Sequence, residues 1–137
     1  MTDPEASADG VIHAYYAAFN RGDWDGMCAL LSDDVAHDLN QGARQLGRAA
    51  FRSFLDRMAR CYREQVRDVV VMTAADGRAA AEYIVEGEYV ATDEGLPPAR
   101  GQRYVLPGGA FFEVRGGRIR RVTNYYNLTD WLRQVSP

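Results

Sequence analysis

The sequence predicts an α+β domain in which helices cover one side of an antiparallel sheet. Apolar residues recur about every 3.6 positions as far as residue 62, and at every second position from residue 65 onward. Turn signals then divide the second half of the chain into four strands in a meander. With 137 residues, the chain has the usual size of one domain that buries a core without disulfides or a structural metal.

The first helix follows two candidate cap residues, Ser7 and Asp9, and stops at Gly22, which suits a left-handed turn. The first ten residues contain acidic and polar residues and no apolar run, and we expect residues 1–8 to form a flexible tail in front of a single domain over residues 9–137. The start of the chain lacks the basic residues and apolar run of a signal peptide, so none is expected.

Two further helices are expected before residue 63. Asp23 is a suitable N-cap for a short helix that ends at the turn signal of residues 32–34. A brief strand over residues 35–39 and a loop at residues 40–42 separate it from the third helix. The third helix shows the clearest amphipathic stripe, which consists of Phe51, Phe54, Leu55, Met58 and Tyr62.

The second half of the chain predicts the strands of the sheet. Asp76-Gly77 is a dipeptide that favours a tight hairpin turn, because both positions require a positive φ. Gly87 lies inside an alternating run and is expected to mark a β-bulge. Residues 93–102 contain Gly and Pro and predict a loop, and a short segment over residues 128–135 ends the chain. The expected strands are residues 65–73, 79–92, 103–115 and 118–126.

Composition and charge exclude several classes of partner. The formal net charge is −3, and all 16 basic residues are arginines spread among 19 acidic residues, so we expect no nucleic acid to bind. No apolar stretch is long enough to cross a bilayer, so no membrane partner is expected. Cys28 and Cys61 lie far apart in helical apolar patterns, which is typical of free thiols in a reducing compartment. We therefore expect a cytoplasmic protein.

Neither a metal site nor an organic cofactor is expected. Glu82, Glu86 and Glu88 alternate along one predicted strand without an accompanying second histidine, and acidic residues in this pattern face water or arginines. Gly108-Gly109 lacks the strand-to-helix context of a nucleotide-binding turn.

Four segments of the sequence carry a resemblance to known proteins. They are residues 15–23, 31–35, 47–54 and 116–119, which read YYAAFNRGD, LSDDV, GRAAFRSF and GGRI. Together they are similar to the nuclear-transport-factor-2-like superfamily. The resemblance implies a cone-shaped, cystatin-like roll in which three N-terminal helices pack on a strongly curved antiparallel sheet with a central cavity. It also implies a homodimer formed through the outer face of the sheet.

Two branches of this superfamily resemble the chain: ketosteroid-isomerase-like proteins and SnoaL-like polyketide cyclases. Isomerases of the first branch use a tyrosine, a carboxylate base and a protonated aspartic acid around one substrate oxygen. Tyr15 matches the tyrosine, and Asp38 lies within one residue of the expected base. Ala110 stands where the resemblance implies the second acid.

The cyclase branch is the closer match in the loop of residues 95–101 and in the ending, residues 119–135. Its usual pattern has aspartates in the last strand and just after it, where this chain has Asn124 and Asn127. An amide polarises a carbonyl or binds a hydroxyl, but it does not carry a proton at neutral pH.

His37 and Asp38 are the two candidates for a catalytic base, because both side chains do general acid/base work. Neighbouring side chains on a strand point to opposite faces, so the two do not both enter a cavity unless the strand breaks there. The sequence leaves open which one enters. The expected ligand-binding residues supply aromatic surface and polar groups for a planar ligand, and they are Tyr15, Phe19, Asn40, Met58, Tyr104, Phe112, Asn124 and Tyr126.

Three functions fit these observations. The first is an isomerase or a lyase of cyclase type, which removes a proton beside a carbonyl of an apolar, aromatic or polycyclic small molecule. The second is a ligand-binding domain without chemistry, because Ala110, Asn124 and Asn127 replace expected acids. The third is a dimerisation module that uses the sheet alone.

Overall fold

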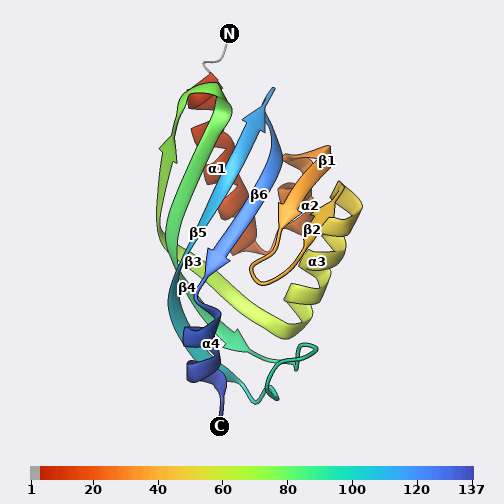
Figure 1. Cartoon of the computed structure of the whole chain (residues 1–137), viewed down its shortest axis with the longest axis vertical. Helices are drawn as coiled ribbons and strands as arrows, with labels where there is room; N and C mark the ends of the chain where they lie inside the picture. Colours follow the sequence, from red (N-terminus) through yellow and green to blue (C-terminus); the bar gives the residue numbers. More distant parts are fainter. Residues whose placement is uncertain (1–3) are drawn as a thin grey trace.

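A curved six-stranded sheet and its helices make up the computed structural model of the chain, which describes residues 4–137 (Figure 1). The elements are α1 (Pro4–Arg21), α2 (Trp24–Ala29), β1 (Leu31–Asp38), β2 (Arg44–Leu46), α3 (Arg48–Cys61), β3 (Tyr62–Thr73), β4 (Arg78–Tyr89), β5 (Gln102–Arg115), β6 (Arg118–Tyr126) and α4 (Leu128–Val135). The predicted α+β class and the three N-terminal helices are confirmed. Helix α1 begins at Pro4 and so includes residues 4–8 of the expected tail, while residues 1–3 lie outside the described part.

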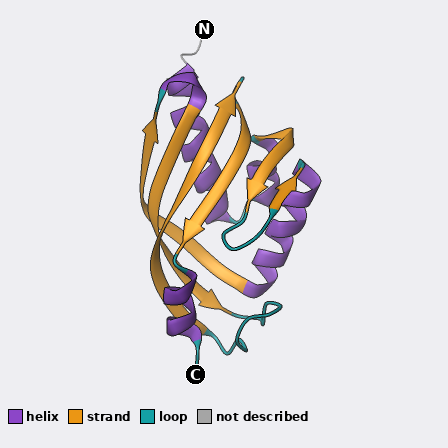
Figure 2. Ribbon diagram, in the orientation of Figure 1, coloured by secondary structure: helices purple, strands orange, loops and turns teal. Residues whose placement is uncertain are grey.

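The strand order is β2-β1-β6-β5-β4-β3. Strands β3 to β6 form the expected antiparallel meander. Strand β1, however, pairs with β6 in parallel, so the sheet is antiparallel except at this pair. Figure 2 shows α1, α2 and α3 on one side of the sheet, while α4 follows the end of β6.

A register shift between β3 and β4, the pair at one edge of the sheet, contributes to the curvature of the sheet. The pairing of β3 with β4 shifts between Arg67 and Val70, where Asp68 adopts a φ of 55°. An extra residue of this kind bends a strand and increases its twist. Figure 1 shows the result, because β3 sweeps from the lower end of α3 across to the opposite edge of the molecule. The bulge was expected at Gly87 instead, and that expectation was wrong, because Gly87 pairs in regular register with Tyr104.

Strand β1 begins earlier than its sequence pattern predicts. The turn signal at residues 32–34 lies inside the strand, and α2 already ends at Ala29. Leu31 and Val35 are fully buried, and Ile119 of β6 donates its amide to the Leu30 carbonyl at 2.8 Å. Burial and pairing at this edge therefore override the local turn preference of the sequence. Strand β2 was not predicted, and it pairs with the end of β1.

Two glycines allow close contacts that another residue would block. The predicted hairpin at Asp76-Gly77 is confirmed, with φ values of 64° and 81°. A Cβ atom on Gly77 would lie 2.0 Å from the carbonyl oxygen of Val114 on β5. A Cβ atom on Gly87 would lie 2.3 Å from Cζ of Tyr104, so the Tyr104 ring lies directly over this glycine.

Two hydrophobic clusters fill the interior. The larger one lies between α1, α2, α3 and the sheet, and the smaller one joins α4 to β4 and β5 through Tyr89, Tyr104, Leu106, Trp131 and Val135. Within residues 4–137, each helix is too short or too polar to cross a lipid bilayer.

Replacing Gly77 by Ala tests the hairpin. We expect Gly77→Ala to lower the free energy of unfolding by about 2 kcal/mol or more, because it combines a positive φ with a backbone clash. Gly10 lies in α1, and a Cβ atom added to it would meet no atom within 4 Å, so Gly10→Ala should raise the free energy of unfolding by about 0.5–1 kcal/mol. Urea unfolding of both variants measures the difference, and equal effects would contradict this account of the turn.

Candidate functional site

A cavity of about 390 Å³ opens between the helices and the concave side of the sheet. Its wall takes residues from all four helices and five strands, and its rim includes the loops around residues 39–42 and 93–96. Most of the wall is aromatic or aliphatic, with a small number of polar groups at separate points. This composition is typical of small-molecule sites.

His37 is the imidazole of this wall. Its side chain is 1% exposed and lies between the rings of Phe51 and Phe54, with centroid distances of 4.4 and 4.7 Å. Nδ2 of Asn124 on β6 lies 3.1 Å from His37 Nε2, so a hydrogen bond joins the amide to this ring nitrogen. Among the described residues, Nδ1 has no hydrogen-bond partner. Burial lowers the pKa of His37 to about 4, despite the opposing charge of Asp38, so the imidazole is neutral at pH 7.

Asp38 lies on the opposite face of β1 and does not line the cavity. Its two carboxylate oxygens accept hydrogen bonds from Arg44 at 2.6 and 3.0 Å, and Oδ2 also accepts one from Thr123 at 2.6 Å. The bonds from Arg44, with that from Thr123, lower the pKa of Asp38 to about 2 although partial burial opposes them. Asp38 thus joins β2, β1 and β6, and the structure separates it from the cavity that His37 lines.

The other predicted site residues divide into two groups. Seven of the eight expected ligand-binding residues line the cavity: Tyr15, Phe19, Asn40, Met58, Tyr104, Asn124 and Tyr126. Phe112 does not, since it is fully buried behind Tyr15, with a ring-centroid distance of 5.7 Å. Asn40 donates from Nδ2 to the Tyr126 carbonyl at 2.9 Å, which ties the loop at the rim to the end of β6. Asn127 is the N-cap of α4 and accepts from the amide of Asp130.

Glu64 is a cavity residue that the sequence analysis missed. It lies on β3, and one oxygen, Oε2, accepts a hydrogen bond from the Tyr104 hydroxyl. Burial raises the pKa of Glu64, while the bond from Tyr104 opposes this shift. The alternation of Tyr62, Glu64 and Val66 is the signal that would have found it, but the predicted strand began only at residue 65.

A network around Asp93 fixes the rim near α4. The Asp93 carboxylate accepts from the Tyr62 hydroxyl at 2.8 Å and forms an ion pair with Arg57 at 3.7 Å. The hydroxyl of Tyr89 accepts from the amide of Asp93 at 2.9 Å and donates to the carbonyl of Pro97 at 2.7 Å. The loop between β4 and β5 is therefore held at Asp93 and at Pro97 against the aromatic cluster beneath it.

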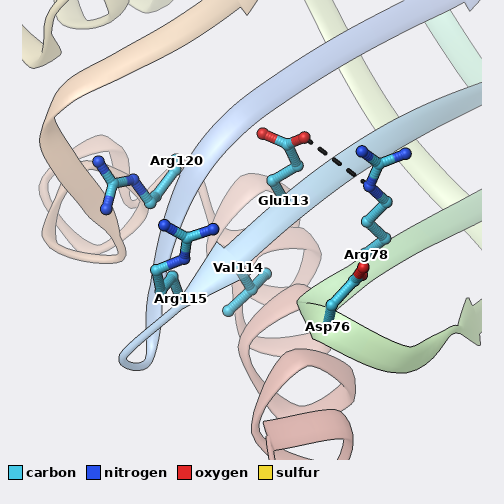
Figure 3. Close-up of a pocket in the computed structure, with 6 residues that line it drawn as sticks. All are labelled: Asp76, Arg78, Glu113, Val114, Arg115 and Arg120. Atoms are coloured by element: carbon cyan, nitrogen blue, oxygen red, sulfur yellow. Dashed lines mark ion pairs between the residues drawn. The ribbon is translucent and has the colours of Figure 1, made fainter.

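A second hollow, of about 330 Å³, lies at the end of the sheet where the β3–β4 and β5–β6 connections turn (Figure 3). It is lined by Asp76, Arg78, Glu113, Val114, Arg115 and Arg120. Acidic and basic side chains face each other there, and Arg78 pairs with Glu113 at 3.9 Å. Since it has no aromatic wall and its charges largely compensate, we take the inner cavity as the candidate site.

Comparisons with known proteins identify the family. A comparison with curated proteins found no match. The crystal structure of a proposed polyketide cyclase from Xanthomonas campestris pv. campestris is 64% identical with a TM-score of 0.94, over 98% of this chain and 100% of that chain. A proposed polyketide cyclase from Pseudomonas putida is 60% identical with a TM-score of 0.93, over 94% of this chain and 98% of that one.

A more distant structure supports the fold alone. It is a nuclear-transport-factor-2-like protein from Burkholderia xenovorans, which is 14% identical with a TM-score of 0.74 and covers 95% of this chain and 96% of that chain. The model of the SnoaL-like domain matches residues 12–122, which confirms the resemblance seen in the sequence. The chain therefore belongs to the SnoaL-like domain family.

Proposed function

We propose that this protein is a small-molecule enzyme of isomerase or cyclase type, which transfers a proton at a carbon beside a carbonyl. The observation that carries the proposal is His37, an imidazole kept neutral in the wall of an aromatic cavity and oriented by Asn124. The high identity to two proposed polyketide cyclases supports the same class of chemistry. The substrate is an apolar, aromatic or polycyclic molecule that fits the cavity wall.

The proposed reaction needs no cofactor to balance. His37 Nε2 takes the proton from the substrate carbon as the ligand replaces the Asn124 amide at this nitrogen. The C–H electron pair moves into the carbonyl, and the resulting enolate oxygen accepts a hydrogen bond from Asn124. In an isomerase, the imidazolium returns its proton to another carbon of the enolate. In a cyclase, the enolate carbon attacks a second carbonyl of the same molecule, and the new alkoxide takes that proton.

The low pKa of His37 has two opposing effects on this chemistry. A neutral imidazole is always available as the base at pH 7, but its basicity is weaker than that of an exposed histidine. The imidazolium formed in the buried site loses its proton readily, which favours rapid return of the proton to the substrate.

A ligand-binding protein without chemistry is the alternative. It is favoured by the nearly complete burial of His37 and by the amide at Asn124.

Carbon–hydrogen exchange tests the proposed base. In deuterium oxide, we expect the wild type to introduce deuterium beside the carbonyl of aromatic 1,3-diketones, and mass spectrometry measures the rate. His37→Ala should lower this rate by about 10²- to 10⁴-fold, because it removes the base. His13→Asn is the matched control, since His13 is the other histidine and lies exposed on α1. Ligand binding without exchange in the wild type would favour the binding protein instead.

The stability of the fold should report the protonation of His37. Its pKa falls from 6.5 in the unfolded chain to about 4 in the fold, so the unfolded chain binds more protons between these values. This pKa difference contributes to the free energy of unfolding fully above pH 6.5, and the contribution is lost as the pH falls toward 4. The loss is about 3 kcal/mol in total, at 1.36 kcal/mol per pKa unit. Urea unfolding from pH 7 to 4 should show this loss in the wild type and not in His37→Gln. Equal pH profiles would contradict the shift.

We also propose that the protein is a cytoplasmic homodimer that pairs through the outer face of the sheet. Phe111 and Tyr125 are 48% and 57% exposed on this face, and their rings contact each other with centroids 5.9 Å apart. Val70, Met72 and Val105 are also about half exposed on β3 and β5. Exposed apolar side chains gathered on one face are typical of a protein interface. The two free, buried cysteines support a reducing compartment.

A charge on the outer face should separate the two subunits. We expect the wild type to sediment as a dimer and Phe111→Arg to sediment as a monomer, because an unpaired buried charge is costly at an interface. Leu46→Arg is the matched control, since Leu46 is 70% exposed on the edge strand β2, three strand spacings from Phe111 on β5. Sedimentation velocity distinguishes the species. A wild-type monomer, or a monomer formed equally by both variants, would refute this interface.

A further inference from the structure

Glu64 is a carboxyl group in the cavity wall that forms no ion pair with any residue of the described part of the chain. Among the residues that the structure describes, most acidic side chains near the sheet pair with an arginine, as Asp38, Glu86, Asp93 and Glu113 do. Glu64 takes part in no such ion pair within residues 4–137, and the Tyr104 hydroxyl is its hydrogen-bond partner. A carboxylate removed from water without a positive partner is unfavourable. The free oxygen, Oε1, is therefore available to a ligand.

Aromatic rings surround this carboxylate. The ring of Tyr104 crosses over Gly87 to reach Glu64, and Trp131 packs against Tyr104 with a centroid distance of 5.8 Å. Burial raises the pKa of Tyr83 to about 12, and the negative charge of Glu64 adds to this shift. Burial also raises the pKa of Tyr126; a hydrogen bond with Asn40 opposes this shift, and the charge of Glu64 adds to it. Glu64 and its aromatic neighbours thus combine a carboxyl group, which a bound cation would hold in its charged form, with electron-rich ring faces, and this environment attracts an organic cation.

The charges around the cavity leave an excess of negative charge. Three acidic residues line it: Glu64, Asp93 and Glu94. Arg57 is the arginine of the wall, and it already pairs with Asp93. His37 is neutral at pH 7 and contributes no positive charge. A cavity of this sign attracts cations and repels anions before they make contact.

We propose that the Glu64 end of the cavity binds a protonated amine on the aromatic ligand. This inference rests on the proposed function, because it names the substrate class of the same cavity. The ammonium group donates to Oε1 of Glu64 while the rings of Tyr83 and Tyr104 contact its carbon substituents. His37 and Glu64 lie on β1 and β3, which are four strand spacings apart in the sheet order, so the carbonyl and the amine occupy opposite walls. At about 4.8 Å per spacing, the path along the sheet between these strands is roughly 19 Å before curvature shortens it.

Three probes with one ring system test the inference. They are 2-naphthylmethylamine, 2-naphthylmethanol and 2-naphthoate, which present a cation, a neutral donor and an anion at pH 7. Isothermal titration calorimetry on the full chain measures each dissociation constant. We expect the wild type to bind the amine about 10- to 100-fold more tightly than the alcohol, as a charge-assisted hydrogen bond implies, and to bind the acid least.

Two variants assign the preference to one side chain. Glu64→Gln keeps the shape of the side chain and removes its charge. The dissociation constants of the amine and the alcohol should then agree within about threefold, instead of differing by about 10- to 100-fold as in the wild type. Glu82→Gln is the matched control, since Glu82 is an exposed glutamate on β4, and it should keep the wild-type preference. If Glu64→Gln fails to fold, the binding of the three probes to the wild type still tests whether the cavity prefers an amine.

Several outcomes would overturn the inference. Equal binding of amine and alcohol by the wild type, tightest binding of 2-naphthoate, or no binding of any probe would each contradict an amine site. A preference that survives in Glu64→Gln would place the cation elsewhere and contradict the role of Glu64. His37→Asn separates this inference from the proposed function, because it should lose carbon exchange and still prefer the amine. Exchange that depends on His37 without an amine preference would refute the amine site alone.

Discussion

The parallel pairing of β1 with β6 decides which side chains reach the cavity. Its register places His37 beside Val122 and Asp38 beside Thr123, so the imidazole turns inward and the carboxylate outward. The outward carboxylate then binds Arg44 and Thr123 and fixes the same register from the other face. A slip of one residue would exchange the two faces, bury an aspartate in an apolar wall and expose the imidazole. The ion pair outside the cavity thus stabilises the geometry inside it.

Much of the fold was predictable from the sequence, because local patterns determine it. The stripe of α3, the positive φ values at Asp76-Gly77 and the limits of β6 follow from side-chain period and turn chemistry. The parallel edge, the early start of β1 and the bulge at Asp68 were not predictable in this way. Each depends on a partner strand distant in sequence, and that partner overrides the preference of the local residues.

In the candidate site, too, local patterns predicted some features and distant partner strands determined the others. Alternation on a strand predicted that His37 and Asp38 would face apart, but only the pairing of β1 shows which one faces the cavity. Asn40 and Asn124 were expected to bind ligand, and both also hold other parts of the protein in place, the β6 end and the His37 ring. Glu64 escaped prediction because the helix-to-strand boundary was set three residues too late. Phe112 has the right chemistry but lies one layer behind the wall.

The second hydrophobic cluster has a consequence for the end of the chain. Tyr104 belongs at once to the cavity wall and to the cluster that holds α4, where it packs against Trp131. Gln134 adds two hydrogen bonds to the backbone of Val105 on the same strand. The binding of a ligand that orders Tyr104 and the docking of α4 are thermodynamically linked. Each equilibrium strengthens the other by the same factor. A change that loosens the docking of α4 therefore also weakens the binding of any ligand that orders Tyr104.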